Sequence, residues 1–230
     1  MKICGIRSPT DLRVAVDAGA DAMGLICGIT HVSEDALTPD QARDLQRHAP
    51  PFVSTVLVTH LAEASEVLEL ARYIGVDTIQ LHGLMSHQAA VEVKAEADGR
   101  RVIKTVHVLD SNAVSEAIAM RDACDAVQLD SRTKDRLGGT GQTHDWSISR
   151  QITEHLSASP DRPLPVILAG GLTPENVSVA IEAVRPFAVD VNSGVEDDSG
   201  NKDLGRCVAF ASRARATLPV SVRPIRVAPT

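Results

Sequence analysis

The first chemically reactive side chain is that of Cys4, in the segment Lys2-Ile-Cys-Gly-Ile6. This apolar segment predicts a strand over 1–5, and side-chain alternation along a strand places Lys2 and Cys4 on one face. A thiol has an unperturbed pKa of about 8.5, and a nearby ammonium such as Lys2 would favour thiolate near neutral pH. Cys4 could therefore act as a base. The alternative is a buried cysteine beside a Lys2 that forms a structural ion pair.

A second candidate is Asp130, in Gln128-Leu-Asp-Ser131, where a predicted strand meets the glycine-rich segment 138–141. A carboxyl group at such a strand end can serve as a general acid or base. The alternative is an aspartate that only caps its loop.

Two further strand ends carry glycines, in Leu168-Ala-Gly-Gly171 and Asp190-Val-Asn-Ser-Gly194. Glycine lets backbone N–H groups approach a ligand closely, and such loops after neighbouring strands can bind phosphate. The paired segments therefore predict a phosphate site. Simple turns that need glycine at positive φ are the alternative.

The eight histidines are scattered, and a metal site would need three of them to converge. Those near predicted strand ends are His31, His60, His82 and His107. We expect no metal, and we interpret His82 as a polar residue that lines a pocket. Gly139-Thr-Gly141 lacks the spacing of a dinucleotide or P-loop motif, so no nucleotide cofactor is expected.

Short aliphatic runs alternate with amphipathic segments along the whole chain, which is typical of βα units around a parallel sheet. Strands are predicted near 1–5, 21–27, 52–58, 77–82, 101–107, 125–130, 164–169 and 187–192. Helices are predicted near 9–19, 39–48, 61–74, 86–97, 111–122, 146–158, 174–184 and 202–216. Eight such units favour a single (β/α)8 TIM barrel, in which the loops after the strands build the active site.

The helices should begin at recognisable caps. Ser8-Pro9, Thr38-Pro39 and Thr173-Pro174 each place a hydroxyl before a proline at the first helical position. We expect the barrel to occupy residues 1–217 and residues 218–230, with three prolines, to form a flexible tail.

Composition excludes several classes of protein. The 230 residues carry a formal net charge of −7 without a basic cluster, so a nucleic-acid partner is not expected. The N-terminal residues lack a signal-peptide pattern, and no run of about twenty apolar residues could span a bilayer. We therefore expect a cytoplasmic protein without a membrane partner, whose four cysteines are free thiols.

Several motifs appear together in one order along nearly the whole chain. They are Lys2-Ile-Cys-Gly-Ile6, Ala18-Gly-Ala-Asp-Ala-Met-Gly24, Gln80-Leu-His-Gly83, Leu129-Asp130, Gly138-Gly-Thr-Gly-Gln-Thr-His-Asp-Trp146, Leu168-Ala-Gly-Gly-Leu-Thr-Pro-Glu-Asn-Val177 and Arg185-Pro-Phe-Ala-Val-Asp-Val-Asn-Ser-Gly-Val-Glu196. With these motifs the chain resembles the phosphoribosylanthranilate isomerase family of tryptophan biosynthesis.

The resemblance implies an Amadori rearrangement of a phosphoribosylamine, an aldose–ketose isomerisation that needs no cofactor. Cys4 matches the family's base, and Asp130 matches its acid, which protonates the furanose oxygen before the C2 proton is removed. The substrate site then contains Gly170, Gly171, Asp190, Asn192, Ser193, Gly194 and His82, with phosphate against the glycines and Ser193 and with Asp190 near the sugar hydroxyls. The expected partner is a small phosphorylated sugar, and the expected assembly is a monomer or homodimer.

The chain departs from the family at the aglycone end of the site. In the family, an arginine in the loop after the second strand holds the anthranilate carboxylate, but segment 28–37 has no lysine or arginine. His60 ends the third strand without the usual aromatic residue nearby, and His144 replaces a phenylalanine. Other cations that could serve are Arg7, Arg132, Lys134 and Arg136, whereas Glu34 and Asp35 would repel a carboxylate.

N-(5-phosphoribosyl)anthranilate is the default substrate. If no other cation compensates, its specificity constant should lie at least about tenfold below that of an intact arginine site. Two alternatives remain open. One is the same acid–base pair acting on a different ribose-phosphate conjugate, which the altered aglycone end favours. The other is a non-catalytic phosphosugar-binding relative, against which the presence of both Cys4 and Asp130 argues.

Overall fold

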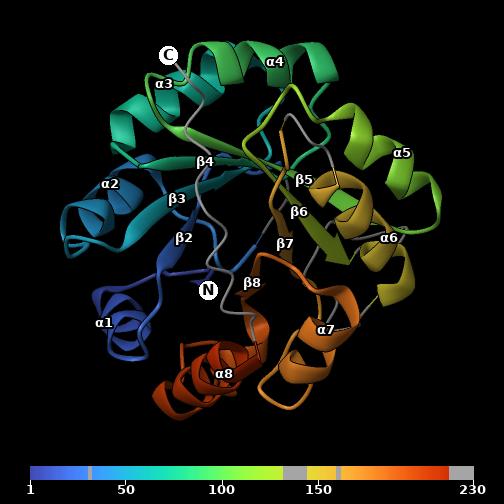
Figure 1. Cartoon of the computed structure of the whole chain (residues 1–230). Coiled ribbons are helices and arrows are strands. Elements are labelled where there is room, and N and C mark those ends of the chain that lie inside the picture. Colours follow the sequence, from blue (N-terminus) through green and yellow to red (C-terminus); the bar gives the residue numbers. More distant parts are fainter. Residues whose placement is uncertain (31–32, 132–143, 159–161, 218–230) are drawn as a thin grey trace, which may run out of the picture.

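A computed structural model describes residues 1–30, 33–131, 144–158 and 162–217. Eight strands form a closed barrel in the order β1 to β8, and every neighbouring pair is parallel. The strands are Lys2–Ile3 (β1), Ala22–Ile26 (β2), Ser54–Thr59 (β3), Thr78–Leu81 (β4), Arg101–Val108 (β5), Ala126–Ser131 (β6), Val166–Leu168 (β7) and Ala188–Val191 (β8). The predicted (β/α)8 barrel is confirmed (Figure 1).

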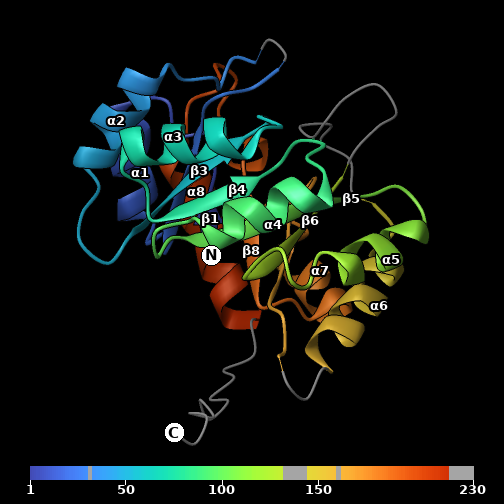
Figure 2. The ribbon, with the colours of Figure 1, turned by 90° about the horizontal axis from the view of Figure 1, so that it is seen from above.

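A helix follows each strand, and the helices surround the barrel (Figures 1 and 2). They are Pro9–Asp17 (α1), Pro39–Arg47 (α2), Ala64–Ile74 (α3), His87–Ala95 (α4), Asn112–Ala119 (α5), Trp146–Ser157 (α6), Val177–Val184 (α7) and Leu204–Thr217 (α8), with a 3₁₀ turn at Ser193–Val195 (η1). Helix α8 packs against both α7 and α1, so the outer layer closes on itself like the sheet within it.

The core is built from aliphatic side chains, as the low aromatic content of 2% requires. Of the large side chains that are fully buried, Phe210 is aromatic and the rest are leucine, isoleucine or methionine. Because the strands pack against helices outside and one another inside, they can be hydrophobic on both faces. Several buried polar side chains lie at the carboxyl ends of the strands, where barrel enzymes place their sites; they are Thr59, His60, His82, His107, Asp130 and Ser131.

Two of the three predicted helix caps are confirmed. Ser8 accepts a hydrogen bond from the Asp11 N–H at 3.1 Å, and Thr38 accepts one from Gln41 at 3.2 Å. The Gln41 side chain in turn accepts from the Thr38 N–H at 2.9 Å, which completes a capping box.

The cap predicted at Thr173-Pro174 is wrong, because helix α7 begins at Val177. The Asn176 side chain accepts a hydrogen bond from the Thr173 N–H at 2.8 Å and donates to the Gly171 carbonyl at 2.9 Å. These two bonds fold the intervening residues into a turn against the loop after β7, and the helix starts only beyond it.

The described residues contain no helix that is both long and apolar enough to cross a membrane. The predicted flexible tail, 218–230, lies outside the described residues.

Candidate active site

A cavity of about 510 Å³ opens where the strands end at their carboxyl termini. All nine site residues predicted from the sequence line it, although they come from five different strand ends. They are Cys4, His82, Asp130, Gly170, Gly171, Asp190, Asn192, Ser193 and Gly194. The barrel therefore brings together residues that lie up to 190 positions apart in the sequence.

Cys4 stands directly after β1, where its N–H donates to the Val191 carbonyl of β8 at 2.8 Å. Its thiol needs the space beside Gly24 on β2. A Cβ at Gly24 would lie 2.5 Å from the Cys4 Sγ, so any larger residue would displace the thiol. The two neighbouring strands thus fix the position of Cys4.

Burial raises the pKa of the Cys4 thiol to about 11, even though the Lys2 ammonium beside it acts in the opposite direction. The expectation that Lys2 would maintain a thiolate near neutral pH is therefore wrong for the free protein. Removing a thiolate from water, together with repulsion from the Asp190 carboxylate, costs more here than attraction by Lys2 and Lys202 returns. Cys4 is a protonated thiol when substrate arrives.

Lys2 forms a buried ion pair with Asp190, with 2.7 Å between Nζ and Oδ2. The two residues are register partners on β1 and β8, so their side chains leave adjacent strands on the same face. This is the structural ion pair that the sequence left open as an alternative. The second carboxylate oxygen of Asp190, Oδ1, is buried and has no hydrogen-bond partner among the described residues.

Asp130 lies near the end of β6, where its Oδ1 accepts a hydrogen bond from the Ser131 N–H at 2.7 Å. Burial raises the pKa of the Asp130 carboxyl group to about 7, and the nearby carboxylate of Asp190 raises it further than burial alone would. A carboxyl group with this pKa still holds a proton at neutral pH in a large part of the molecules. Asp130 can therefore donate a proton, as a general acid must.

The end of β6 and the loops after β7 and β8 touch one another through glycines. Gly170 has a φ of +82°, and a Cβ there would lie 2.3 Å from the Ser131 Oγ. A Cβ at Gly194 would lie 2.0 Å from the Leu172 carbonyl oxygen. Only glycine fits at either position, so the glycines serve the packing of the loops as well as the approach of a ligand.

Three histidines pack together: His60 directly follows β3, His82 directly follows β4, and His107 lies on β5. The rings of His60 and His82 are nearly parallel at 5.2 Å, and His107 meets His82 edge-on at 5.1 Å. Burial, His107 and His60 together hold the pKa of His82 well below its usual range, so His82 is neutral. Among the described residues, no group of three His, Cys, Asp or Glu side chains could hold a metal ion.

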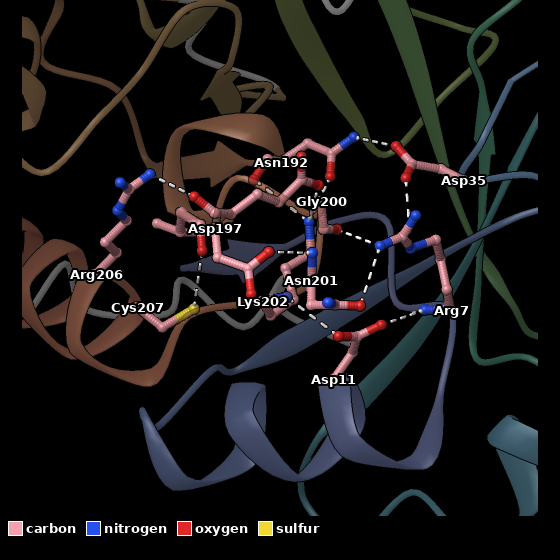
Figure 3. Close-up of polar contacts among 12 residues, drawn as sticks. Arg7, Asp11, Asp35, Asn192, Asp197, Gly200, Asn201, Lys202, Arg206 and Cys207 are labelled. Carbon is pink, nitrogen blue, oxygen red and sulfur yellow. Dashed lines mark hydrogen bonds and ion pairs between the residues drawn. The ribbon is translucent and has the colours of Figure 1, made fainter.

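At the mouth of the cavity, Arg7 from the loop after β1 faces Asp35 from the loop after β2 (Figure 3). The distance from Arg7 Nε to Asp35 Oδ1 is 3.7 Å, and Arg7 Nη2 donates to the Gly200 carbonyl. Asp35 also accepts a hydrogen bond from Asn192 at 2.8 Å. Of the four cations considered from the sequence, Arg7 lines the cavity, while Arg132, Lys134 and Arg136 lie outside the described residues.

His144 does not extend an aromatic wall. Its Nδ1 lies 3.0 Å from the Ser131 Oγ, and its Nε2 lies 2.6 Å from the Ser149 Oγ. Burial lowers the pKa of His144 to about 4, so a neutral ring links the end of β6 to helix α6.

Sequence reasoning missed several polar residues of the site. Gln80 and Gln128 line the cavity two positions before His82 and Asp130, and strand alternation could have identified both. Lys202 carried no such signal. Its ammonium is fully buried and lies 2.6 Å from both Glu196 Oε1 and Asn192 Oδ1, which fixes the loop after β8.

Comparison with known proteins places this geometry in a family. The family model described as N-(5'phosphoribosyl)anthranilate (PRA) isomerase matches residues 1–213. N-(5'-phosphoribosyl)anthranilate isomerase 2 of Methanosarcina mazei is 38% identical over 94% of this chain and 93% of its own length.

Two solved structures agree with this assignment. The crystal structure of phosphoribosyl anthranilate isomerase from Thermotoga maritima has a TM-score of 0.78 at 35% identity, covering 94% of this chain and 98% of that one. A phosphoribosyl anthranilate isomerase in complex with reduced 1-(o-carboxyphenylamino)-1-deoxyribulose 5-phosphate has a TM-score of 0.74 at 33% identity, covering 94% and 97%. This chain belongs to the N-(5'-phosphoribosyl)anthranilate isomerase family.

Proposed function

We propose that this protein isomerises N-(5'-phosphoribosyl)anthranilate to the corresponding 1-amino-1-deoxyribulose 5-phosphate, a step of tryptophan biosynthesis. The observation that carries the proposal is the pairing of Asp130, whose pKa is about 7, with Cys4 in one cavity between the strand ends. An aldose–ketose isomerisation needs one group that protonates the ring oxygen and another that removes the C2 proton. These two side chains supply both.

Asp130 is the general acid in this proposal. Its proton passes to the furanose oxygen, the C1–O bond breaks, and the nitrogen lone pair forms a C1=N iminium. Because Asp130 is buried beside the carboxylate of Asp190, losing a proton is costly until a positive charge appears on the substrate. The iminium supplies that charge, so the acid ionises when the ring opens.

Cys4 is the base. The thiol gives its proton to solvent, and the resulting thiolate removes the proton at C2 while the C–H electrons form the C1=C2 bond and the iminium electrons return to nitrogen. The enolamine then ketonises: the Cys4 thiol gives a proton to C1, and the Asp130 carboxylate accepts the proton of the C2 hydroxyl group. Cys4 regains its proton from solvent, so both groups return to their starting state. The nearby iminium and the Lys2 ammonium both stabilise the thiolate, which offsets the burial that holds its pKa near 11.

The glycine loops support the phosphate part of the proposal. Gly170, Gly171, Ser193 and Gly194 line one end of the cavity, which we call the phosphate end. Barrel proteins often bind phosphate in the loops after their seventh and eighth strands, where backbone N–H groups face the ligand. Asn192 and Asp190 also line the cavity, and Asp190 Oδ1, which has no hydrogen-bond partner among the described residues, can accept a hydrogen bond from a sugar hydroxyl.

The proposal extends to the chain as a whole. We propose that residues 1–217 act as one domain, that the protein works in the cytoplasm as a monomer or homodimer, and that the substrate is its ligand without any cofactor.

The assay follows the loss of N-(5'-phosphoribosyl)anthranilate fluorescence with purified protein, together with growth of a tryptophan auxotroph that lacks this isomerase. Turnover and restored growth are expected. Tight binding of the reduced product analogue without turnover would indicate a non-catalytic relative. Turnover only with phosphoribosylamines whose aglycone has no carboxyl group would favour a different conjugate, in keeping with the acids Glu34 and Asp35 at the cavity.

A further inference from the structure

The cations around the cavity differ in how tightly they are already bound. Lys2 is held by Asp190 at 2.7 Å, and Lys202 is held by Glu196 at 2.6 Å. Both ammonium groups are buried and lie in short ion pairs. Arg7 is 3.7 Å from its carboxylate partner, Asp35, and is the only arginine or lysine among the described residues that line the cavity.

Arg7 also has hydrogen-bond donors to spare. An arginine carries five N–H groups, and both hydrogen bonds of the Arg7 side chain to described residues come from Nη2. Those bonds, to the Gly200 carbonyl and to the Asn201 side chain at 3.5 Å, anchor the guanidinium from one side. Its Nε and Nη1 groups make no hydrogen bond within the described part of the chain.

The carboxylate of Asp35 stands between two donors that belong to other loops. It accepts from Asn192 Nδ2 at 2.8 Å and faces Arg7 at 3.7 Å (Figure 3). A carboxylate from the loop after β2 is thus held at the cavity by groups after β8 and β1. This is the arrangement that a ligand carboxylate would need, already filled by a side chain of the protein.

We propose that Arg7 determines specificity by binding the carboxylate of the substrate's aglycone, and that Asp35 is an internal stand-in which the substrate displaces. This inference rests on the proposed function, because anthranilate is the part of that substrate that carries a carboxylate. The exchange keeps Arg7 in an ion pair, and the displaced Asp35 carboxylate, which is about one-fifth exposed, can turn toward solvent. The substrate carboxylate binds Arg7 more strongly than Asp35 does, because it can form two short parallel hydrogen bonds with the guanidinium group. Asp35, at 3.7 Å from Arg7 Nε, does not form them.

The test measures binding by calorimetry with two ligands. One is reduced 1-(o-carboxyphenylamino)-1-deoxyribulose 5-phosphate, and the other is the same compound without its carboxyl group. The wild-type protein should bind the carboxylated ligand more tightly. Arg7→Met should weaken that binding about ten- to hundredfold, the loss expected for hydrogen bonds to a charged group, and leave binding of the other ligand unchanged.

Asp35→Asn should have the opposite effect, because Arg7 is then no longer held in an ion pair. It should tighten binding of the carboxylated ligand in the wild-type background and have no such effect in Arg7→Met. Arg72→Met is the matched control, since it removes one positive charge on helix α3 and an ion pair with Asp98 without touching the cavity.

Equal losses for both ligands in Arg7→Met, or no preference for the carboxylated ligand in the wild-type protein, would overturn the inference. Failure of the proposed function gives a different result. In that case the carboxylated ligand still binds through Arg7, but the wild-type protein does not turn over N-(5'-phosphoribosyl)anthranilate.

Discussion

The two ends of the cavity hold charge in different ways. At the catalytic end, Cys4 and Asp130 are buried, and burial raises the pKa of both so that each retains a proton it must later release. At the end where Arg7 and Asp35 lie, both side chains are about one-fifth exposed and face each other as a loose ion pair. One end has acids that resist ionisation, and the other has charges that can exchange partners.

This difference follows from what each end must do. A proton is transferred only where the energies of the two protonation states are nearly matched, and burial beside a second carboxylate achieves that for Asp130. Binding a carboxylate needs a full positive charge with free donors instead, which is easier to keep near solvent. Asp130 lies on β6 and Cys4 directly follows β1, whereas Arg7 and Asp35 lie further out on loops, so the second end can change without disturbing the first.

The largest expected effects separate the two ends kinetically. Cys4→Ala and Asp130→Asn should each lower kcat about 10²- to 10⁴-fold, because each removes one proton-transfer group. Neither should change the affinity for the carboxylated product analogue by a comparable factor. Steady-state kinetics and calorimetry on the same preparations check this. Near-normal turnover by Cys4→Ala would show that the thiol is structural and that another group is the base.

A second prediction concerns stability at the catalytic end. Folding raises the pKa of Asp130 from 3.8 to about 7, so the folded state loses stability as pH rises between these values and the carboxylate must be buried. Asn is a neutral counterpart of the protonated form. Asp130→Asn should therefore match the wild type near pH 4 and exceed it by about 2–4 kcal/mol above pH 7.

Urea unfolding at pH 4.5, 6 and 8 measures this difference. A gap that stays constant across the three pH values would mean that Asp130 titrates alike in the folded and unfolded states. Asp35→Asn, at the exposed end, serves as the matched control.

The fold could be predicted from the sequence because each βα unit has a local pattern, an aliphatic run followed by a helix with a polar face. The start of helix α7 could not be predicted in this way, because the Asn176 side chain bonds to Thr173 and Gly171 and the helix begins only at Val177. Whether Asn176 forms this turn, rather than Thr173 capping the helix, depends on the position of the loop after β7, which no local sequence pattern shows.

For the site, the positions of Cys4 and Asp130 at strand ends predicted that they line one cavity, but not which of them is protonated. The presence of Lys2 near Cys4 suggested a thiolate, yet the balance between burial and one cation depends on the depth of the cavity and on the pairing of Lys2 with Asp190. The Arg7–Asp35 contact could not be predicted from the sequence either, since it joins the loops of two separate βα units.

The smallest expected effect tests the phosphate end. Gly170 and Gly99 both have positive φ, +82° and +81°, so an alanine at either position is strained, by about 1–3 kcal/mol. They differ in their surroundings. A Cβ at Gly99 would meet nothing within 4 Å, whereas one at Gly170 would lie 2.4 Å from the Ser131 N and 2.8 Å from Asp130 Oδ1.

Gly170→Ala should therefore weaken competitive inhibition by inorganic phosphate about tenfold, on the order of one lost hydrogen bond to a charged group, while Gly99→Ala leaves it unchanged. Both variants should unfold at a lower urea concentration than the wild type. The loss of stability in Gly99→Ala measures the effect of backbone strain alone. Because the crowded atoms belong to Asp130 and Ser131 at the end of β6, the displaced segment includes the acid, so kcat should fall as well. Equal phosphate inhibition in the two alanine variants would place the phosphate elsewhere and leave the glycines of the loop after β7 with a packing role only.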